Sequence, residues 1–319
     1  FTGEAVLTLP NREFTFHDAA VVSRQWEHRR LAALRTLAQD EPPLVVTTPE
    51  ALLQRTLPKH LLLQTVHTLR VGEVHDLNEL AETLTAAGYV RCDQVEGVGQ
   101  FALRGGILDL FSPACAEPIR CEFFGDEIDA MGTFDPATQR RVENRQVCDI
   151  LPVAEVLPQL APGGYAGLTE AMDGLISQVK GSKGDHAALL TTLSQDRERL
   201  SQGHSFPAMD RYLALIYPEL ATAADYLPED AVVCLAESPR VAERARNYLW
   251  RMEEDVKTLL EAGLVAGQIA RFVRTFEELM ARLSDYPVVF LDTFTSNTYP
   301  LRPKSLLDVL TKQLPSYGA

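Results

Sequence analysis

The sequence predicts an α/β protein whose parallel-sheet domain is split along the chain by a smaller α+β module. Two short apolar runs lead directly into helix starts, near Thr48 and near Ser238, which is typical of parallel α/β units. Between them the pattern changes to consecutive strand-like runs around a Gly105-Gly106 pair, which indicates an antiparallel meander. The chain of 319 residues is long enough for two or three domains.

The first region, residues 1–68, alternates strand and helix. An apolar run at 5–9 is followed by a helical spacing of apolar residues over about 18–37. The β-branched run at 44–47 then meets Thr48, which suits a helix cap, and a proline, which suits a first helical turn. We therefore expect this region to form the first part of the parallel-sheet domain.

The middle region, residues 69–150, begins with a predicted helix that Asp76 caps and Gly88 ends. Only strand-like runs follow this helix, at 89–92, 100–104, 107–111, 119–124 and 130–134. One helix followed by a meander predicts a small α+β module that is inserted between the α/β segments.

The third region, residues 151–319, returns to the α/β pattern. Two helices are expected within 165–199, separated by a segment rich in Gly and Lys. Buried-type strands are expected at 231–235 and 287–292, and the first leads into a helix with Ser238 as the expected cap. This region is expected to complete the split domain.

Acidic residues outnumber basic ones, with 44 Asp and Glu against 30 Lys and Arg and a formal net charge of −14. Binding along nucleic-acid phosphates requires clustered cations, so this balance argues against a DNA-binding surface. No apolar run is long enough for a membrane span and the first residues lack a signal-peptide pattern, so we expect a cytoplasmic protein with no membrane partner. The five cysteines form no C-x-x-C motif, which predicts reduced thiols and no metal site.

The sequence contains no recognisable catalytic motif. A phosphate-binding loop of the form G-x-x-x-x-G-K-[ST] is absent, and the Gly and Lys cluster at 181–184 follows no predicted strand. Asp292 ends an apolar strand where a magnesium-binding acid would lie, but Thr293 follows it, so we interpret Asp292 as a turn residue. We therefore predict that this segment is not an enzyme and binds no cofactor.

Side chains alternate across a strand, so the position of the turn predicts which residues of the module face outward. With the turn at the diglycine pair, Arg104 is opposite Ile107 and Ala102 is opposite Asp109. The apolar residues of this hairpin then share the inner face: Phe101, Leu103, Leu108 and Leu110. The expected outward-facing residues are Arg104, Ala102 and Asp109, followed in the next strand by Arg120, Glu122 and Phe124.

A large aromatic side chain beside an Arg and a Glu on an outer sheet face is typical of a protein-binding surface. The alternative is an ordinary solvated face on which a neighbouring loop covers one Phe, and the pattern alone favours neither. The distinction depends on whether Arg104, Arg120 and Phe124 lie together and exposed on one side of the module.

Three segments of the module resemble a known family: residues 95–111, 117–129 and 133–140. They are similar to the UvrB-homology module of the bacterial transcription-repair coupling factor, Mfd. Residues 48–55 and 226–228 resemble the flanking parts of the same N-terminal region. The resemblance implies a degenerate helicase-like domain of RecA type without ATPase function, split in sequence by an inserted UvrA-binding module.

The resemblance also implies a docking role. In this family the module imitates the part of UvrB that binds UvrA, so that a factor at a stalled RNA polymerase recruits the nucleotide excision repair proteins. The full-length family protein is an ATP-dependent DNA translocase, which contacts RNA polymerase and DNA through regions outside this segment. The UvrA-binding surface is expected to be masked in the intact protein until the factor engages polymerase.

The resemblance assigns UvrA contacts to six residues, and the family pattern is only partly matched. The six residues are Arg91, Arg104, Arg120, Glu122, Phe123 and Phe124. Ala102 stands where UvrB has an arginine, so the expected contact set is partial. The chain is also expected to begin inside the first α/β domain and to end before the polymerase-binding and motor regions.

The alternative is UvrB itself, or another helicase-type ATPase that acts on damaged DNA. UvrB is similar in the same segments, but it carries an intact phosphate-binding loop and an aromatic-rich hairpin that threads DNA. Neither feature is found in this sequence, so the docking function is preferred.

Overall fold

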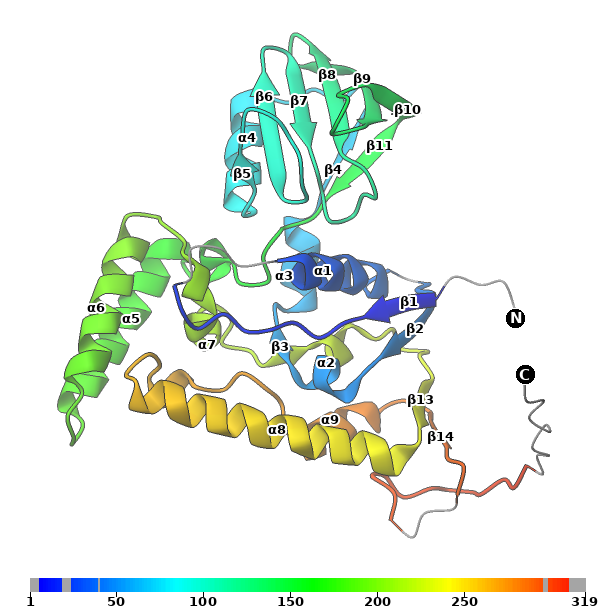
Figure 1. The fold of residues 1–319 in the computed structure, drawn as a ribbon, viewed down its shortest axis with the longest axis vertical. Helices are drawn as coiled ribbons and strands as arrows, with labels where there is room; N and C mark the ends of the chain where they lie inside the picture. Colours follow the sequence, from blue (N-terminus) through cyan, green and yellow to red (C-terminus); the bar gives the residue numbers. More distant parts are fainter. Residues whose placement is uncertain (1–5, 19–23, 40, 295–297, 310–319) are drawn as a thin grey trace, which may run out of the picture.

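The computed structural model describes residues 6–18, 24–39, 41–294 and 298–309. Figure 1 shows a module containing a sheet, from β4 (His67–Arg70) to β11 (Val147–Ile150), that stands above a larger body. The segments before and after the module together form the body, in which a pair of helices lies at one side and a long helix runs along the base. The predicted mixture of helices and a multistranded sheet is confirmed.

The body before the module alternates strands and helices. Its elements are β1 (Val6–Leu9), α1 (Gln25–Leu37), β2 (Leu44–Thr47), α2 (Pro49–Leu53), β3 (Arg55–Thr56) and α3 (Lys59–Thr65). Strands β1 and β2 pair in parallel, and Thr48 caps α2 by accepting a hydrogen bond from the backbone N–H of Ala51. Helix α1 is shorter than predicted, because Asp18 is not helical; residues 19–23 lie outside the described ranges.

The body after the module is dominated by helices. Its elements are η1 (Pro158–Leu160), α5 (Gly164–Gly181), α6 (Ala187–Ser201), η2 (Pro207–Tyr212), α7 (Leu213–Ile216), β12 (Ala221–Thr222), η3 (Ala223–Tyr226), β13 (Val233–Ala236), α8 (Ser238–Glu261), η4 (Gly267–Ile269), α9 (Phe276–Leu283) and β14 (Val288–Leu291). The two helices predicted within 165–199 are present as α5 and α6. Ser238 begins α8 and does not cap it as predicted; its hydroxyl instead donates a hydrogen bond to Asp292 Oδ2 at 2.8 Å.

The predicted parallel pairing is present, but in two separate pieces. Within the described ranges, β1 pairs only with β2, and β13 pairs only with β14. The body is held together by a large apolar core from segments on both sides of the module, including Leu31, Leu34, Met172, Leu193, Tyr212 and Leu259. None of the helices in the described part of the chain is long and apolar enough to cross a membrane.

The module contains the predicted meander. Its elements are β4, α4 (Leu77–Ala86), β5 (Val90–Arg91), β6 (Gln100–Arg104), β7 (Ile107–Leu110), β8 (Ile119–Phe124), β9 (Glu127–Phe134), β10 (Arg141–Arg145) and β11. One sheet has the order β10-β9-β8-β7-β6-β5, while β4 and β11 form a separate antiparallel pair. The register across the diglycine turn is the predicted one, with Arg104 opposite Ile107 and Ala102 opposite Asp109. Strand β10 was not predicted, because all of its residues are exposed and it has no hydrophobic alternation.

One face of the six-stranded sheet packs against α4 and forms a core that belongs to the module. Asp76 caps α4 as predicted, accepting hydrogen bonds from the backbone N–H groups of Asn78 and Glu79. Buried members of this core are Leu80, Leu84, Phe101, Leu110, Cys121 and Ile128. The other face of the same sheet is therefore the one available for contacts outside the core.

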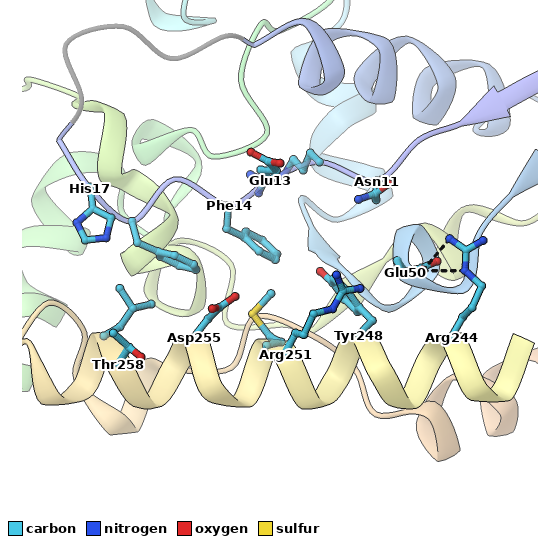
Figure 2. Close-up of a pocket in the computed structure, with 14 residues that line it drawn as sticks. Asn11, Glu13, Phe14, His17, Glu50, Arg244, Tyr248, Arg251, Asp255 and Thr258 are labelled. Atoms are coloured by element: carbon cyan, nitrogen blue, oxygen red, sulfur yellow. Dashed lines mark hydrogen bonds and ion pairs between the residues drawn. The ribbon is translucent and has the colours of Figure 1, made fainter.

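A hollow of about 640 Å³ lies in the body between residues 11–17 and helix α8 (Figure 2). Its charged lining is mixed, and Arg244 Nη2 lies 2.9 Å from Glu50 Oε1. Within the part of the chain that the structure describes, no group of His, Cys, Asp and Glu side chains is arranged to hold a metal ion. The hollow therefore indicates no particular ligand chemistry.

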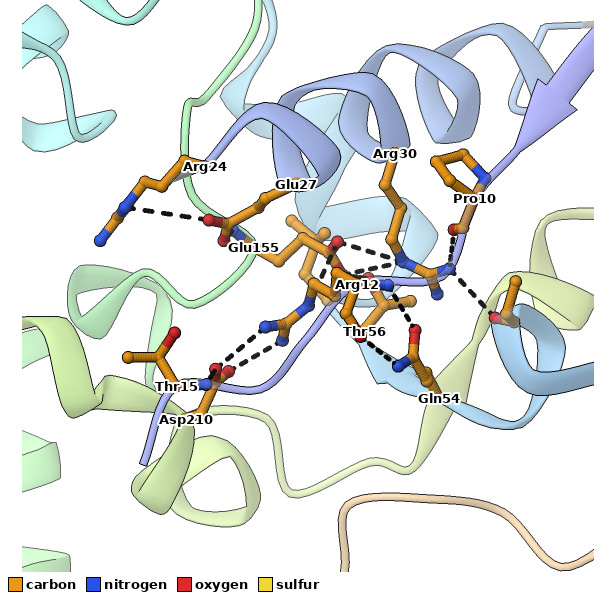
Figure 3. A network of polar contacts seen from close by, with 12 residues as sticks. Pro10, Arg12, Thr15, Arg24, Glu27, Arg30, Gln54, Thr56, Glu155 and Asp210 are labelled. Carbon is orange, nitrogen blue, oxygen red and sulfur yellow. Dashed lines mark hydrogen bonds and ion pairs between the residues drawn. The ribbon is translucent and has the colours of Figure 1, made fainter. Parts of the chain in front are cut away.

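A buried network of charged side chains joins the two parts of the body (Figure 3). The fully buried carboxylate of Glu155 lies 3.1 Å from Arg30 Nε and 3.3 Å from Arg12 Nε. It also accepts a hydrogen bond from the hydroxyl of Thr56 at 2.5 Å. Arg12 forms a bidentate pair with Asp210, at 2.8 and 3.0 Å. Because a buried charge is stabilised only by its partners, these contacts fix the segment before the module against the segment after it.

We expect Glu155→Ala to lower the free energy of unfolding by about 3–5 kcal/mol, because two buried guanidinium groups lose their shared partner. Denaturant unfolding followed by circular dichroism measures this loss. The matched control is Asp173→Ala, which removes the exposed ion pair of Asp173 with Arg197 and is expected to have no measurable effect. Equal stability losses in the two variants would contradict the structural role of Glu155.

His28 of helix α1 lies where the body meets the module. A Cβ atom placed on Gly99 of the module would be 3.6 Å from His28 Cε1. The Nε2 atom of His28 is buried and has no hydrogen-bond partner in the described part of the chain. Burial, together with the positive charge of Arg24, lowers the pKa of His28 to about 4.

This lowered pKa makes stability depend on pH. Below about pH 6.5 the unfolded chain protonates His28 while the native protein does not, so the stability contributed by the neutral imidazole is lost as the pH falls from 6.5 toward 4. We expect His28→Gln to reduce the loss of unfolding free energy between pH 7 and pH 5 by about 1 kcal/mol. Denaturant titrations of both proteins at the two pH values measure the difference, and an identical pH dependence would be inconsistent with a buried neutral His28.

Candidate protein-binding surface

The diglycine turn sets the geometry of the outer sheet face. Gly105 has a φ of +58°, a conformation that a glycine adopts without strain. Gly106 packs directly against β8: its carbonyl accepts a hydrogen bond from the Phe123 N–H at 2.7 Å, and a Cβ on Gly106 would lie 2.9 Å from the Phe123 carbonyl oxygen. The turn therefore brings Arg104 next to the end of β8.

The carboxylate of Asp109 is the centre of this face. It is buried and accepts two hydrogen bonds from Arg120, from Nε at 2.7 Å and from Nη2 at 2.8 Å. Arg104 donates a third, from Nη2 at 2.6 Å. Arg120 also lies over the ring of Phe134, with its guanidinium carbon 4.6 Å from the ring centroid. The hydrogen bonds to Asp109 raise the pKa of Arg120, so its charge is maintained.

Ala102 and Asp109 lie on the predicted side of the sheet, opposite each other. Both are nevertheless fully buried, so this part of the outer side does not face solvent. Ala102 forms a small apolar cluster with Val95, from the segment between β5 and β6, and with Phe134 of β9. Alternation identifies the side of a sheet on which a residue lies, but it does not show whether a loop covers that side.

The exposed part of the face is concentrated near the diglycine turn. Phe124 is 84% exposed, and the side chain of Arg104 is 48% exposed. Glu122 is half-buried and its Oε1 lies 3.2 Å from Nη2 of Arg141 in β10, a contact that the sequence did not reveal because β10 was not predicted. Sheet register places Ile107 between Arg104 and Glu122. We call Arg104, Arg120, Glu122 and Phe124 the outer face.

Two of the six expected contact residues lie elsewhere. Phe123 is half-buried and packs against the core of the module, on the side opposite Phe124. Arg91 is exposed on the edge strand β5, where its register partner is Phe101, a core residue. Because paired residues in a sheet share a side, Arg91 lies on the side opposite Arg104. The structure thus places four of the six expected residues on one side of the sheet. Of these, Arg120 is not exposed as expected, since only 16% of its side chain is accessible.

Comparisons with known proteins show which family the module is similar to. A family model described as the UvrB interaction domain matches residues 67–155, which include the whole outer face. The chain is 29% identical over 317 residues to the transcription-repair-coupling factor of Bacillus subtilis (strain 168). It is 25% identical to those of Staphylococcus haemolyticus (strain JCSC1435) and Staphylococcus aureus (strain MRSA252), and each alignment covers 98% of this chain. Nearly the whole of this chain is therefore similar to transcription-repair-coupling factors, and its module matches the UvrB interaction domain.

The resemblance to the UvrB-homology region of that family is therefore confirmed. The chain spans 26% of the length of each of these relatives, so the similarity covers one part of each of them. The family match extends a few residues beyond β11, through the segment that leads to Glu155 and the body.

We expect Asp109→Ala to lower the free energy of unfolding by about 2–3 kcal/mol, because Arg120 loses a bidentate partner in a largely desolvated position. Glu122→Ala is the matched control, since it removes a carboxylate whose pair with Arg141 is partly exposed. Its expected effect is about 0.5 kcal/mol or less. Denaturant unfolding of both variants tests the difference, which would be absent if Asp109 were not the central group.

Proposed function

We propose that this chain is the UvrB-homology part of a transcription-repair coupling factor and that it recruits UvrA, a nucleotide excision repair protein, to stalled RNA polymerase. The observation that carries the proposal is the outer face: Phe124 is exposed on the same side of the sheet as two arginines that a buried carboxylate holds in place. Arginine and aromatic residues are enriched among the residues that dominate binding energy at protein interfaces. The match to a UvrB interaction domain supports UvrA as the partner.

Our proposal keeps all six expected UvrA contacts: Arg91, Arg104, Arg120, Glu122, Phe123 and Phe124. Arg104, Arg120, Glu122 and Phe124 form the direct contact surface. Phe123 is the residue before Phe124 in β8 and packs against the core of the module. In our proposal it acts indirectly, by anchoring the end of β8 that carries Phe124. Arg91 contributes only if UvrA reaches around the β5 edge of the sheet, because it lies on the opposite side from Arg104.

We further propose that the body is a degenerate helicase-like domain of RecA type, split into residues 1–68 and 151–319 by the module at 69–150. The parallel pairs β1–β2 and β13–β14 support this, as does the position of α2 and α8 directly after strands of these pairs. The absence of a phosphate-binding loop from the sequence supports a non-catalytic role for this segment.

In the whole protein, the proposal assigns ATP-dependent DNA translocation and the contacts with RNA polymerase and DNA to regions outside this chain. The net charge of −14 supports this division, because phosphate binding needs clustered cations. The segment itself then acts by presenting its outer face to UvrA.

We expect Arg104→Glu and Phe124→Ala each to weaken UvrA binding roughly 30-fold, or about 2 kcal/mol, because each removes a central contact. Isothermal titration calorimetry with purified UvrA measures the affinities, and circular dichroism verifies that the variants remain folded. Arg91→Glu is expected to weaken binding less than Arg104→Glu, owing to its position across the sheet.

The controls match the tested residues in chemistry and exposure. Phe294→Ala removes a phenylalanine that is 82% exposed on the body, and Arg246→Glu reverses an exposed charge on α8. Both are expected to leave the affinity unchanged. The proposal is overturned if Arg104→Glu and Phe124→Ala bind UvrA as tightly as the wild type, or if the body controls lose as much affinity.

A further inference from the structure

The module holds a pair of thiols that are far apart in sequence and adjacent in space. The Sγ atoms of Cys115 and Cys148 are 3.7 Å apart. Cys115 lies in the loop between β7 and β8, and Cys148 lies in β11, where it is opposite Leu69 of β4. The two residues are separated by 33 positions in sequence, and no short cysteine motif links them.

Hydrogen bonds of Ser112 hold the loop that carries Cys115 against the end of β11. The hydroxyl of Ser112 donates to the carbonyl of Asp149 at 2.8 Å and accepts from the N–H of Leu151 at 3.1 Å. The Ser112 carbonyl accepts from the N–H of Cys115 at 3.0 Å. Because Ser112 is tied to residues on either side of Ile150, the loop carries Cys115 at a fixed position beside Cys148.

The two thiols differ in environment. Cys148 is 3% exposed, whereas Cys115 is half-buried and reachable from solvent. The hydrogen bond between them lowers the pKa of Cys115; burial and Asp149 oppose this lowering, and Arg145 assists it. The same hydrogen bond, together with burial, raises the pKa of Cys148. Cys121, on the same side of the sheet, is buried with its pKa raised to about 12. Cys115 is thus the thiol of this pair that a reagent from solvent can reach.

We propose that Cys115 and Cys148 are an oxidisable dithiol, a modification site at which a peroxide forms a reversible disulfide. The Cys115 thiolate attacks one peroxide oxygen, the O–O bond breaks, and the sulfur loses two electrons to become a sulfenic acid while hydroxide leaves and is protonated to water. Cys148 then attacks the sulfenic sulfur. An S–S bond forms, the S–O bond breaks, and the departing hydroxide takes the thiol proton of Cys148 as a second water.

The disulfide would join the β7–β8 loop to β11 on the core side of the sheet. Arg104 and Arg120 lie on the other side, so the modification does not block the outer face. Closing a loop of this length restricts the unfolded chain and stabilises the module. This inference does not depend on the identity of the docking partner.

The test uses the 319-residue chain treated with stoichiometric hydrogen peroxide, followed by alkylation of remaining thiols and peptide mapping without reductant. We expect a Cys115–Cys148 cross-linked peptide that dithiothreitol removes, and a thermal unfolding midpoint raised by about 5 °C in the oxidised protein. Cys148→Ser should stop the reaction at Cys115 and allow dimedone, a sulfenic-acid reagent, to label it. Cys234→Ser, which removes an exposed thiol of the body, should leave the cross-link unchanged.

Two results would overturn the proposal. One is the absence of the cross-link while Cys234, the more exposed thiol, is oxidised. The other is alkylation of Cys115 in the reduced wild-type protein no faster than alkylation of Cys234, because the proposed reactivity of Cys115 depends on its contact with Cys148 and not on exposure alone. Neither result depends on UvrA binding, so failure of this proposal and failure of the docking proposal are distinguishable.

Discussion

A carboxylate with almost no solvent contact determines how the outer face of the module is built. Asp109 is fully buried. Its negative charge is stabilised there because Arg120 donates two hydrogen bonds to the carboxylate and Arg104 donates a third. The two arginines are consequently ordered before any partner arrives. A free arginine side chain loses up to about 2 kcal/mol of conformational entropy when it is fixed. Part of that loss has already occurred on folding, which favours binding through these side chains.

The sequence predicted the parts of this face that depend on strand period. The diglycine turn fixes the register of β6 and β7, and the period of two then fixes the side on which Arg104, Arg120 and Phe124 lie. It did not predict that Ala102 is covered, because Val95, which packs against it, comes from an irregular segment. Nor did it predict that Asp109 is buried, since this depends on its hydrogen bonds with Arg104 and Arg120. The side of the sheet on which Arg91 lies could not be inferred either. The irregular segment between β5 and β6 interrupts the alternation of side chains, so the positions in β6 do not predict those in β5.

Other features were missed because they leave no local signal. Strand β10 has no apolar alternation, so its Arg141 could not be placed beside Glu122. The parallel strands were recognised individually, but their arrangement as two ladders depends on tertiary packing. The contact between Cys115 and Cys148 depends on the pairing of β11 with β4 and on the loop held by Ser112, which are long-range features. Caps such as Thr48 and Asp76 were predictable because they act within three residues.

The way in which the module joins the body allows both to keep their own cores. Its first and last strands, β4 and β11, pair with each other, so the chain leaves and re-enters the body at neighbouring points. The body is then closed across this junction by Glu155, which binds Arg12 and Arg30 from the preceding segment. A module attached in this way leaves the two faces of its sheet with different environments. The face toward α4 supplies packing and holds the thiols in a desolvated setting, while the face around Asp109 leaves about half of the Arg104 side chain exposed and most of the Arg120 side chain buried. Because adjacent residues of β8 point to opposite faces, a change confined to the Cys121 side need not displace Arg120 or Phe124 on the other side.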